Sequence, residues 1–299
     1  MIAPNLEELL ALRGAAQGLR LPSLHPARAL HIGAHRSAHR GRGLEFQEVR
    51  PYVSGDDPRT IDWRVTARRG RPHTKLFREE RERPVWLLAD LDAAMFFGTR
   101  RQLKSSVVMR AGALLAWSAA LGGDRVGGVV TGTTSHRIVP PRAREAGVLP
   151  VLATLLDLQP KAPAASTSAS LSNGLRAITP LVHPGSLVLV LSDFAALDST
   201  AEAAWAALSV HNDIRMFWVT DPLESQGLPD GRFRIGLPER SVSVDGASTR
   251  PAWTQMWRER EERIEGLALH CSAPVIRLDT SKPVEEELRA VLSSKRTAA

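Results

Sequence analysis

Three aspartates stand where the edge of a sheet could hold a divalent cation. Asp90 and Asp92 follow the apolar run at residues 85–89. Asp193 follows a second apolar run at residues 187–191. Such runs are typical of strands buried on both faces of a parallel sheet, and ligands of open α/β sheets bind beyond the carboxyl ends of the strands. Mg²⁺ can bind through one or two carboxylates and several waters, so the three acids predict a weak Mg²⁺ site.

The same positions also have a purely structural interpretation. Asp is a preferred N-cap residue, and a helical pattern begins near Arg100, so Asp90 or Asp92 could cap that helix. Aspartates at strand ends can also accept hydrogen bonds from loop amides. Spacing alone favours capping for this pair. For Asp90, Asp92 and Asp193 together, the structural and the metal-binding interpretations both stay open.

The paired aspartates also allow an alternative function, that of an Mg²⁺-dependent phosphoryl-transfer enzyme, because Asp side chains at a strand end can hold Mg²⁺ for this reaction. Such an enzyme needs a nucleophile or a general acid close by. The sequence contains no glycine-rich phosphate loop and no Gly-x-Ser-x-Gly elbow, and Ser135-His136 has no orienting acid in its sequence neighbourhood. We therefore assign no catalytic residue and expect a non-catalytic protein.

The elements that must position these acids begin at residue 84. Strand patterns occur at residues 85–91, 125–131, 187–191, 214–219 and 275–278. Helical patterns lie between and after them, at residues 101–121, 144–158, 171–178, 200–210, 251–270 and 284–292. This alternation predicts an α/β, doubly wound fold with a mainly parallel sheet. The Pro/Ala/Ser-rich segment 160–172 predicts a loop, and residues 241–248, with Asp245-Gly246 as the turn, predict a surface hairpin.

Residues 1–83 differ in pattern from the rest of the chain. Helical spacing of apolar residues runs from Leu6 to Leu19, with Asn5 as the N-cap. Residues 31–77 are punctuated by glycines, which is typical of turns and short extended segments. The sequence therefore predicts an N-terminal helix with a small, partly β extension over residues 1–83, followed by the main α/β domain over residues 84–299.

That extension contains a compact group of charged residues, Asp56, Asp57, Arg59 and Asp62. The group could bind a partner protein. The interpretation that the sequence favours is structural: Asp56 or Asp57 accepts hydrogen bonds from loop amides, Arg59 pairs with Asp62, and Trp63 anchors the segment on the main sheet.

The 299-residue chain carries a net charge of +7, which raises nucleic acid or an acidic protein as a partner. Arginines are concentrated between residues 26 and 83, but acids alternate with them, and no stacking aromatics or nucleic-acid-binding module accompany them. Nucleic-acid binding is therefore a disfavoured alternative. No apolar run approaches the roughly 20 residues that cross a bilayer, and the N-terminus lacks a secretion signal. The single cysteine excludes an intrachain disulfide, so we expect a cytoplasmic protein.

Several blocks between residues 32 and 292 resemble the bacterial domain of unknown function 58 family. Because separate blocks occur in the family's order, the resemblance is specific. The blocks are GRGLEF at 41–46, RPY at 50–52, GDD at 55–57, IDW at 61–63, DLDAA at 90–94, DRVG at 124–127, SDF at 192–194 and DPLE at 221–224. The resemblance implies a von Willebrand factor A-like fold.

It also implies a metal-ion-dependent adhesion site, which an Asp-x-Ser-x-Ser loop, a Thr and a distant Asp form in that fold. Asp90 and Asp193 match this pattern. Asp92 and Ala94 replace the two serines, so the motif is degenerate and we expect Mg²⁺ binding to be weak or absent. Candidates for the threonine position are Thr167, Ser168 and Ser170.

Members of that family are often encoded beside MoxR-type AAA+ ATPases and are thought to act with them as chaperone-like partners or adaptors. The resemblance thus implies a MoxR-type ATPase and an unidentified client protein as partners. Together, the residues and the resemblance predict a non-catalytic interaction module with a degenerate adhesion site.

Overall fold

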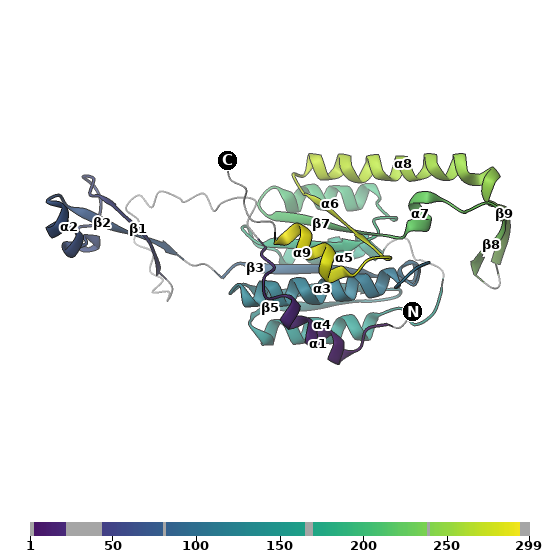
Figure 1. Cartoon of the computed structure of the whole chain (residues 1–299), viewed down its shortest axis with the longest axis horizontal. Coiled ribbons are helices and arrows are strands. Elements are labelled where there is room, and N and C mark those ends of the chain that lie inside the picture. The colour runs from purple at the N-terminus through teal and green to yellow at the C-terminus, as the bar shows by residue number, and fades with distance from the viewer. Residues whose placement is uncertain (1–2, 22–43, 80–81, 165–169, 238–239, 294–299) are drawn as a thin grey trace. The chain divides into compact units, whose positions relative to one another are not determined.

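The computed structural model describes residues 3–21, 44–79, 82–164, 170–237 and 240–293 (Figure 1). The chain divides into two compact units. The larger unit contains residues 1–28 and 83–299, and the smaller one contains residues 29–82. No helix within the described ranges combines the length and the apolar character that a membrane span requires.

A six-stranded sheet forms the centre of the larger unit, in the order β10-β7-β6-β3-β4-β5. Its strands are β3 (Pro84–Leu91), β4 (Arg125–Gly132), β5 (His136–Ala143), β6 (Leu187–Ser192), β7 (Asp213–Thr220) and β10 (Val275–Asp279). All neighbours are parallel except β4 and β5. The chain first builds outward from β3 to β5 and then returns to the other side of β3 with β6. The strand order therefore reverses between β3 and β6, which is where doubly wound folds bind ligands.

Helices cover both faces of this sheet (Figure 1). One face packs against α1 (Leu6–Ala15), α3 (Lys104–Leu121), α4 (Glu145–Leu158) and α9 (Val284–Leu292). The other packs against α5 (Ser170–Ile178), α6 (Ser199–Ser209) and α8 (Gly246–His270). Alternate residues of β3 serve the two cores, since Leu87 lies in the first and Leu88 in the second. This period of two buries both faces of the strand, which explains its unbroken apolar sequence.

The predicted α/β, doubly wound fold with a mainly parallel sheet is confirmed, and each predicted strand of the main sheet is present. The antiparallel strand β5 was not predicted. It lies at the edge of the sheet and contains Pro140 and Pro141. Proline cannot donate to a strand ladder and is therefore tolerated at an edge, but it hides the strand from a pattern search.

The hairpin predicted at residues 241–248 was placed wrongly. The structure has a hairpin of β8 (Arg232–Leu237) and β9 (Arg240–Asp245), and its turn lies outside the described residues. Asp245-Gly246 begins helix α8 instead, because the Asp245 side chain accepts a hydrogen bond from the Ser248 N–H at 3.0 Å. Gly246 approaches Pro229 so closely that a Cβ would lie 1.8 Å from the Pro229 carbonyl oxygen.

The first helix was predicted as part of the N-terminal extension, but the structure places it on the larger unit. Leu9 of α1 is fully buried, and its carbonyl oxygen accepts a hydrogen bond from Trp117 Nε1 of α3 at 3.1 Å. The apolar face of α1 thus completes the core around α3. The predicted loop 160–172 also ends earlier than expected, since α5 begins at Ser170; residues 165–169 lie outside the described ranges.

The smaller unit is partly β, as predicted. It pairs β1 (Leu44–Pro51) with β2 (His73–Glu79) in antiparallel register and contains the 3-10 turn η1 (Pro58–Thr60) and helix α2 (Trp63–Arg69). Gly70 ends α2 in the left-handed region with φ of 69°, a conformation that favours glycine.

Candidate functional site

Asp90 lies at the carboxyl end of β3, buried and surrounded by hydrogen-bond donors. Its Oδ1 accepts from Ser170 Oγ at 2.8 Å, from Thr131 Oγ1 at 3.3 Å and from the Asp92 N–H at 3.2 Å. Its Oδ2 accepts from Ser192 Oγ at 2.8 Å. Strand register explains this ring, because Thr131 is the partner of Asp90 on β4 and Ser192 ends the neighbouring strand β6.

Burial raises the pKa of Asp90 from 3.8 to about 6, and the negative charge of Asp193 adds to this rise. The hydrogen bonds from Ser192 and Ser170 act in the opposite direction, because they stabilise the ionised form. The carboxyl group is therefore much easier to protonate than an exposed aspartate, and its charge responds to that of Asp193 at the end of β6.

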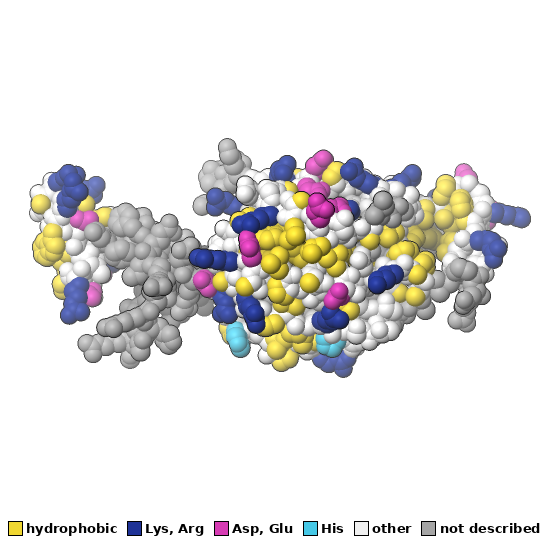
Figure 2. Space-filling view, turned by 90° about the horizontal axis from the view of Figure 1, so that it is seen from below, with side chains coloured by type: hydrophobic (Ala, Val, Ile, Leu, Met, Phe, Trp, Pro, Cys, Tyr) yellow, Lys and Arg dark blue, Asp and Glu magenta, His cyan; other side chains and the backbone are white. Residues whose placement is uncertain are grey.

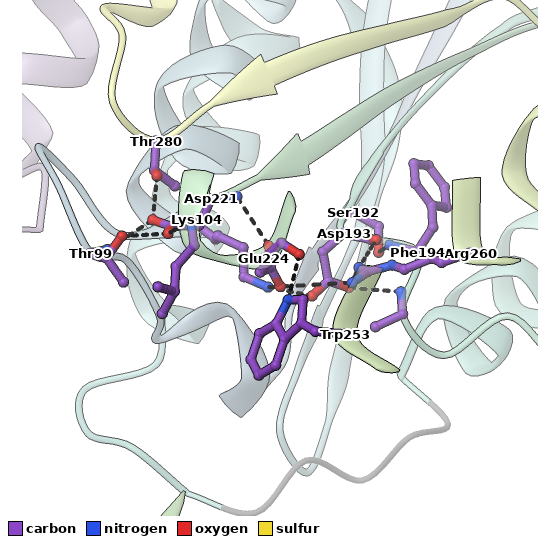
Figure 3. Close-up of polar contacts among 12 residues, drawn as sticks. Thr99, Lys104, Ser192, Asp193, Phe194, Asp221, Glu224, Trp253, Arg260 and Thr280 are labelled. Carbon is purple, nitrogen blue, oxygen red and sulfur yellow. Dashed lines mark hydrogen bonds and ion pairs between the residues drawn. The ribbon is translucent and has the colours of Figure 1, made fainter. Parts of the chain in front are cut away.

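Asp193 forms an ion pair with a lysine that sequence reasoning missed (Figure 3). Lys104 Nζ lies 2.6 Å from Asp193 Oδ2 and 2.9 Å from Glu224 Oε1, and its side chain is only 3% exposed. Burial raises the pKa of Asp193, but the charges of Lys104 and Arg260 outweigh burial and hold this pKa below its ordinary value. Burial lowers the pKa of Lys104, but the charges of Asp193 and Glu224 outweigh burial and hold this pKa above its ordinary value. Both members of the pair therefore stay charged.

Arg260 of α8 adds a second positive charge to this group. Its guanidinium nitrogens lie 3.7 Å from Asp193 Oδ1 and 3.7 Å from Glu224 Oε1, and it also donates a hydrogen bond to the Asp193 carbonyl oxygen. The Arg260 side chain is 22% exposed. Arg260 therefore reaches the surface, while its partners Asp193 and Glu224 also contact the buried lysine. We call Lys104, Asp193, Glu224 and Arg260 the edge cluster.

Helix α7 (Pro222–Gln226) holds Glu224 in place through a capping box. The Asp221 side chain accepts from the Leu223 N–H at 2.9 Å, and Glu224 Oε2 accepts from the Asp221 N–H at 3.0 Å. Thr99 Oγ1 and Thr280 Oγ1 also donate to Asp221, each at 2.5 Å. Burial raises the pKa of Asp221, but the bonds from Thr280 and Thr99 lower it below its ordinary value, so it stays ionised.

Asp92 is buried beside Asp90, as the sequence predicts, but it does not cap a helix through its side chain. It precedes the 3-10 turn η2 (Ala93–Met95), where it forms no side-chain capping bond. Helix α3 begins only at Lys104, after Leu103 as N-cap. The capping interpretation of the strand-end pair is therefore not what the structure shows.

These residues do not fit a resident divalent cation. The described residues contain no group of three or more His, Cys, Asp or Glu side chains arranged to hold a metal ion. Ala94 supplies no oxygen, Asp193 is paired with Lys104, and both oxygens of Asp90 accept hydrogen bonds from hydroxyl groups. Of the three candidates for the adhesion-site threonine position, Ser170 donates to Asp90 at 2.8 Å, whereas Thr167 and Ser168 lie outside the described residues. Metal binding by Asp90, Asp92 and Asp193 stays a prediction.

The charged group of the smaller unit makes local contacts. Asp56 accepts from Arg50 Nη2 at 2.6 Å and from the Val53 N–H at 3.0 Å, and chiefly the latter bond holds the pKa of Asp56 below its ordinary value. Asp57 accepts from the Arg59 N–H at 2.9 Å and so begins η1. The expected hydrogen bonds from loop amides to these acids are therefore present.

Asp62 caps α2 by accepting from the Arg64 and Val65 N–H groups, at 3.0 and 3.1 Å. Trp63, the first residue of that helix, is 70% exposed, and its predicted packing on the main sheet stays a prediction. Its position at the first turn of a short surface helix leaves the indole open. Partner binding by Asp56, Asp57, Arg59 and Asp62 stays a prediction.

Residues 48–263 match the family described as "Protein of unknown function DUF58". The chain belongs to this family. This DUF58 protein is 26% identical over 281 residues to "Uncharacterized protein Mb1516" of Mycobacterium bovis and to "Uncharacterized protein Rv1480" of Mycobacterium tuberculosis. Each match covers 89% of this chain and 84% of the relative.

Two solved structures are also similar to this DUF58 protein. The conserved hypothetical protein BatB from Bacteroides thetaiotaomicron is 15% identical, with a TM-score of 0.44, over 71% of this chain and 100% of that one. A von Willebrand factor type A protein from Catenulispora acidiphila is 11% identical, with a TM-score of 0.38, over 74% of this chain and 44% of that one.

Three members of the edge cluster escaped the sequence analysis, although two carried a signal. Lys104 begins a long apolar helix, where the helix dipole disfavours a cation, so it needed an explanation. Glu224 follows Asp221 by three residues, which is the spacing of a capping box. Arg260 lies in a helix rich in both charges, and nothing in its sequence neighbourhood singles it out.

Proposed function

We propose that this DUF58 protein is a non-catalytic interaction module that binds a partner protein at the carboxyl edge of its main sheet. The observation that carries the proposal is the edge cluster, in which charges from α3, the end of β6, α7 and α8 meet at the point where the strand order reverses. Doubly wound folds bind their ligands at this place. The hydrogen bonds around Asp221 hold the cluster rigidly, and a rigid surface lowers the entropic cost of docking.

The surface next to the cluster suits an acidic partner residue. A cavity of about 300 Å³ beside α7 has Arg100 and Arg250 in its lining. An arginine fork binds carboxylates in two-point geometry, so these two side chains could recruit an acidic group without a metal ion. Arg100 is exposed, whereas Arg250 pairs with Asp230 at 2.6 Å at the surface.

For the partner, we propose a MoxR-type AAA+ ATPase, with which the protein acts as a chaperone-like adaptor on a client. Family membership supports this part of the proposal. An Mg²⁺-dependent phosphoryl-transfer function gains no support from the site, because the edge residues do not fit a resident cation. Figure 2 shows basic and acidic side chains interspersed with apolar ones on the face it draws, which favours protein over nucleic acid as the partner.

Binding of the purified MoxR-type ATPase from the same organism tests this function. We expect the charge-reversed double variant Arg100→Glu/Arg250→Glu to lose at least tenfold in affinity by biolayer interferometry, because it repels an acidic partner group. Arg137→Glu is the matched control, since Arg137 lies on the edge strand β5 and pairs only at the surface with Asp157. A wild-type protein that does not bind the ATPase, or an equal loss in both variants, would contradict the proposal.

A further inference from the structure

We propose that the ammonium group of Lys104 is the built-in cation of this edge and takes the place that a divalent metal ion holds in a metal-dependent adhesion site. The inference concerns the charge balance of the edge and is independent of which partner binds there. It predicts that the protein works without a metal and that removal of this one lysine creates a metal-binding site.

The geometry around Lys104 is that of a coordinated cation. Its Nζ lies within hydrogen-bond distance of carboxylate oxygens from two separate segments, Asp193 after β6 and Glu224 on α7, at 2.6 and 2.9 Å. The ring centroid of Phe97 lies 5.5 Å from the same nitrogen, close enough for a cation–π contact. Two anions and one aromatic face therefore enclose the ammonium group, and the second positive charge, Arg260, lies farther away, 3.7 Å from each carboxylate.

The position of Lys104 in the chain argues that this enclosure is specific. Lys104 is the first residue of α3, where the positive end of the helix dipole repels a cation, and only 3% of its side chain is exposed. Both burial and the helix end oppose a charge here. A lysine at this place is stable only because Asp193 and Glu224 neutralise it.

The neighbouring Asp90 is also arranged for hydrogen bonds and not for a metal. Ser192 Oγ donates to Asp90 Oδ2 and at the same time accepts from the Phe194 N–H at 3.0 Å. Ser170 Oγ donates to the other carboxylate oxygen. In a metal site, carboxylate and hydroxyl oxygens direct their lone pairs at the ion. In this protein the lone pairs of both Asp90 carboxylate oxygens accept hydrogen bonds from serine hydroxyl groups.

The central experiment compares wild type with Lys104→Met, which keeps the length of the side chain and removes its charge. We expect Mn²⁺ titration, followed by electron paramagnetic resonance and calorimetry, to show no saturable site in wild type and one site in Lys104→Met. We also expect the Tm of Lys104→Met to be lower by roughly 10 °C and to recover when Mn²⁺ or Mg²⁺ is added. Arg260 alone, 3.7 Å from each carboxylate, leaves one of their two negative charges without a counter-charge.

Two control variants separate this effect from general damage. Lys282→Met removes a lysine whose side chain is 63% exposed and should change neither Tm nor Mn²⁺ binding. Lys104→Met/Asp193→Asn removes both charges of the closest pair, so its Tm should exceed that of Lys104→Met and should not respond to Mn²⁺.

Three results would overturn the proposal. The first is saturable Mn²⁺ binding to wild type that Asp90→Asn abolishes. The second is a folded Lys104→Met variant that binds no Mn²⁺. The third is a double variant that is no more stable than Lys104→Met. Should Lys104→Met fail to fold, folding of the double variant supports the proposal, and the wild-type titration still decides against it if a site is found. No partner is present in these measurements, so their outcome is separate from that of the ATPase-binding test.

Discussion

The protein contains two groups of mixed charge that look alike in composition and differ in how they are built. In the smaller unit, Arg50, Asp56, Asp57 and Asp62 contact residues a few positions away in the chain. In the edge cluster of the larger unit, Lys104 meets Asp193 and Glu224 across 89 and 120 residues. The first group closes turns, whereas the second joins separate segments of the fold.

The two groups also differ in burial, and burial decides how much stability is lost when an ion pair is broken. The side chains of Arg50 and Asp56 are 35% and 19% exposed, whereas those of Lys104 and Asp193 are 3% and 7% exposed. Water screens an exposed pair, and its loss costs little. A buried pair that loses one partner leaves a charge without solvation. We therefore expect substitutions in the edge cluster to affect stability far more than substitutions in the turns of the smaller unit.

The largest effect is expected for Asp193→Ala. This change leaves the buried ammonium of Lys104 without its nearest carboxylate, and breaking a buried pair in this way costs about 3–5 kcal/mol. Urea unfolding followed by circular dichroism measures the loss. Arg263→Ala, which breaks the exposed pair of Arg263 and Glu202, is the reference. A loss of unfolding free energy in Asp193→Ala no larger than that in Arg263→Ala would show that buried and exposed pairs do not differ here.

A somewhat smaller effect is expected from the titration of Asp90. Its pKa rises from 3.8 to about 6 on folding, so protonation favours the folded state. Its contribution to stability is complete below pH 3.8 and is lost as pH rises through 6, a change of roughly 3 kcal/mol. Asp193, whose pKa is lowered, acts in the opposite direction and loses its contribution as pH falls below its ordinary range.

Asp90→Asn should therefore be more stable than wild type at pH 7 and should flatten the pH dependence between 4 and 6. Urea unfolding at a series of pH values measures both effects. An unchanged pH profile in Asp90→Asn would show that Asp90 does not carry the titration.

Ser170→Ala should have a moderate effect. The Ser170 hydroxyl donates to Asp90 at 2.8 Å and stabilises its ionised form. Its loss should cost about 1 kcal/mol at pH 7 and move the pH midpoint of stability upward, because the pKa of Asp90 rises further. Asn173→Ala, at an exposed position of the same helix, is the control. Equal effects of the two changes on the free energy of unfolding would show that the Ser170 hydroxyl does not stabilise ionised Asp90.

The smallest effect is expected for Asp56→Asn in the smaller unit. The change removes the ion pair with Arg50, and the short turn between Val53 and Asp56 keeps its other bonds. Thermal unfolding of the whole protein should show an unchanged main transition. A main transition as strongly lowered as that of Asp193→Ala would contradict the contrast between the two groups.

The fold was largely predictable because its signals are local. Unbroken apolar runs such as β6 report burial on both faces of a strand, and helical spacing between them reports the crossover connections. Errors arose where local and tertiary requirements differ. Asp245-Gly246 is a turn signal in isolation, but in the fold it caps a helix whose glycine must pass close to Pro229.

The sequence alone determined the strands, the helices and the positions of Asp90, Asp92 and Asp193 at strand ends, because hydrophobic period and strand termini are properties of short segments. Only the tertiary structure decided which charge stands beside these acids. Lys104, Glu224 and Arg260 lie on three different helices, and a distance between side chains so far apart in the chain is set by the packing of the sheet and its helices. Packing thus places two basic side chains, Lys104 and Arg260, beside one of the three aspartates, Asp193.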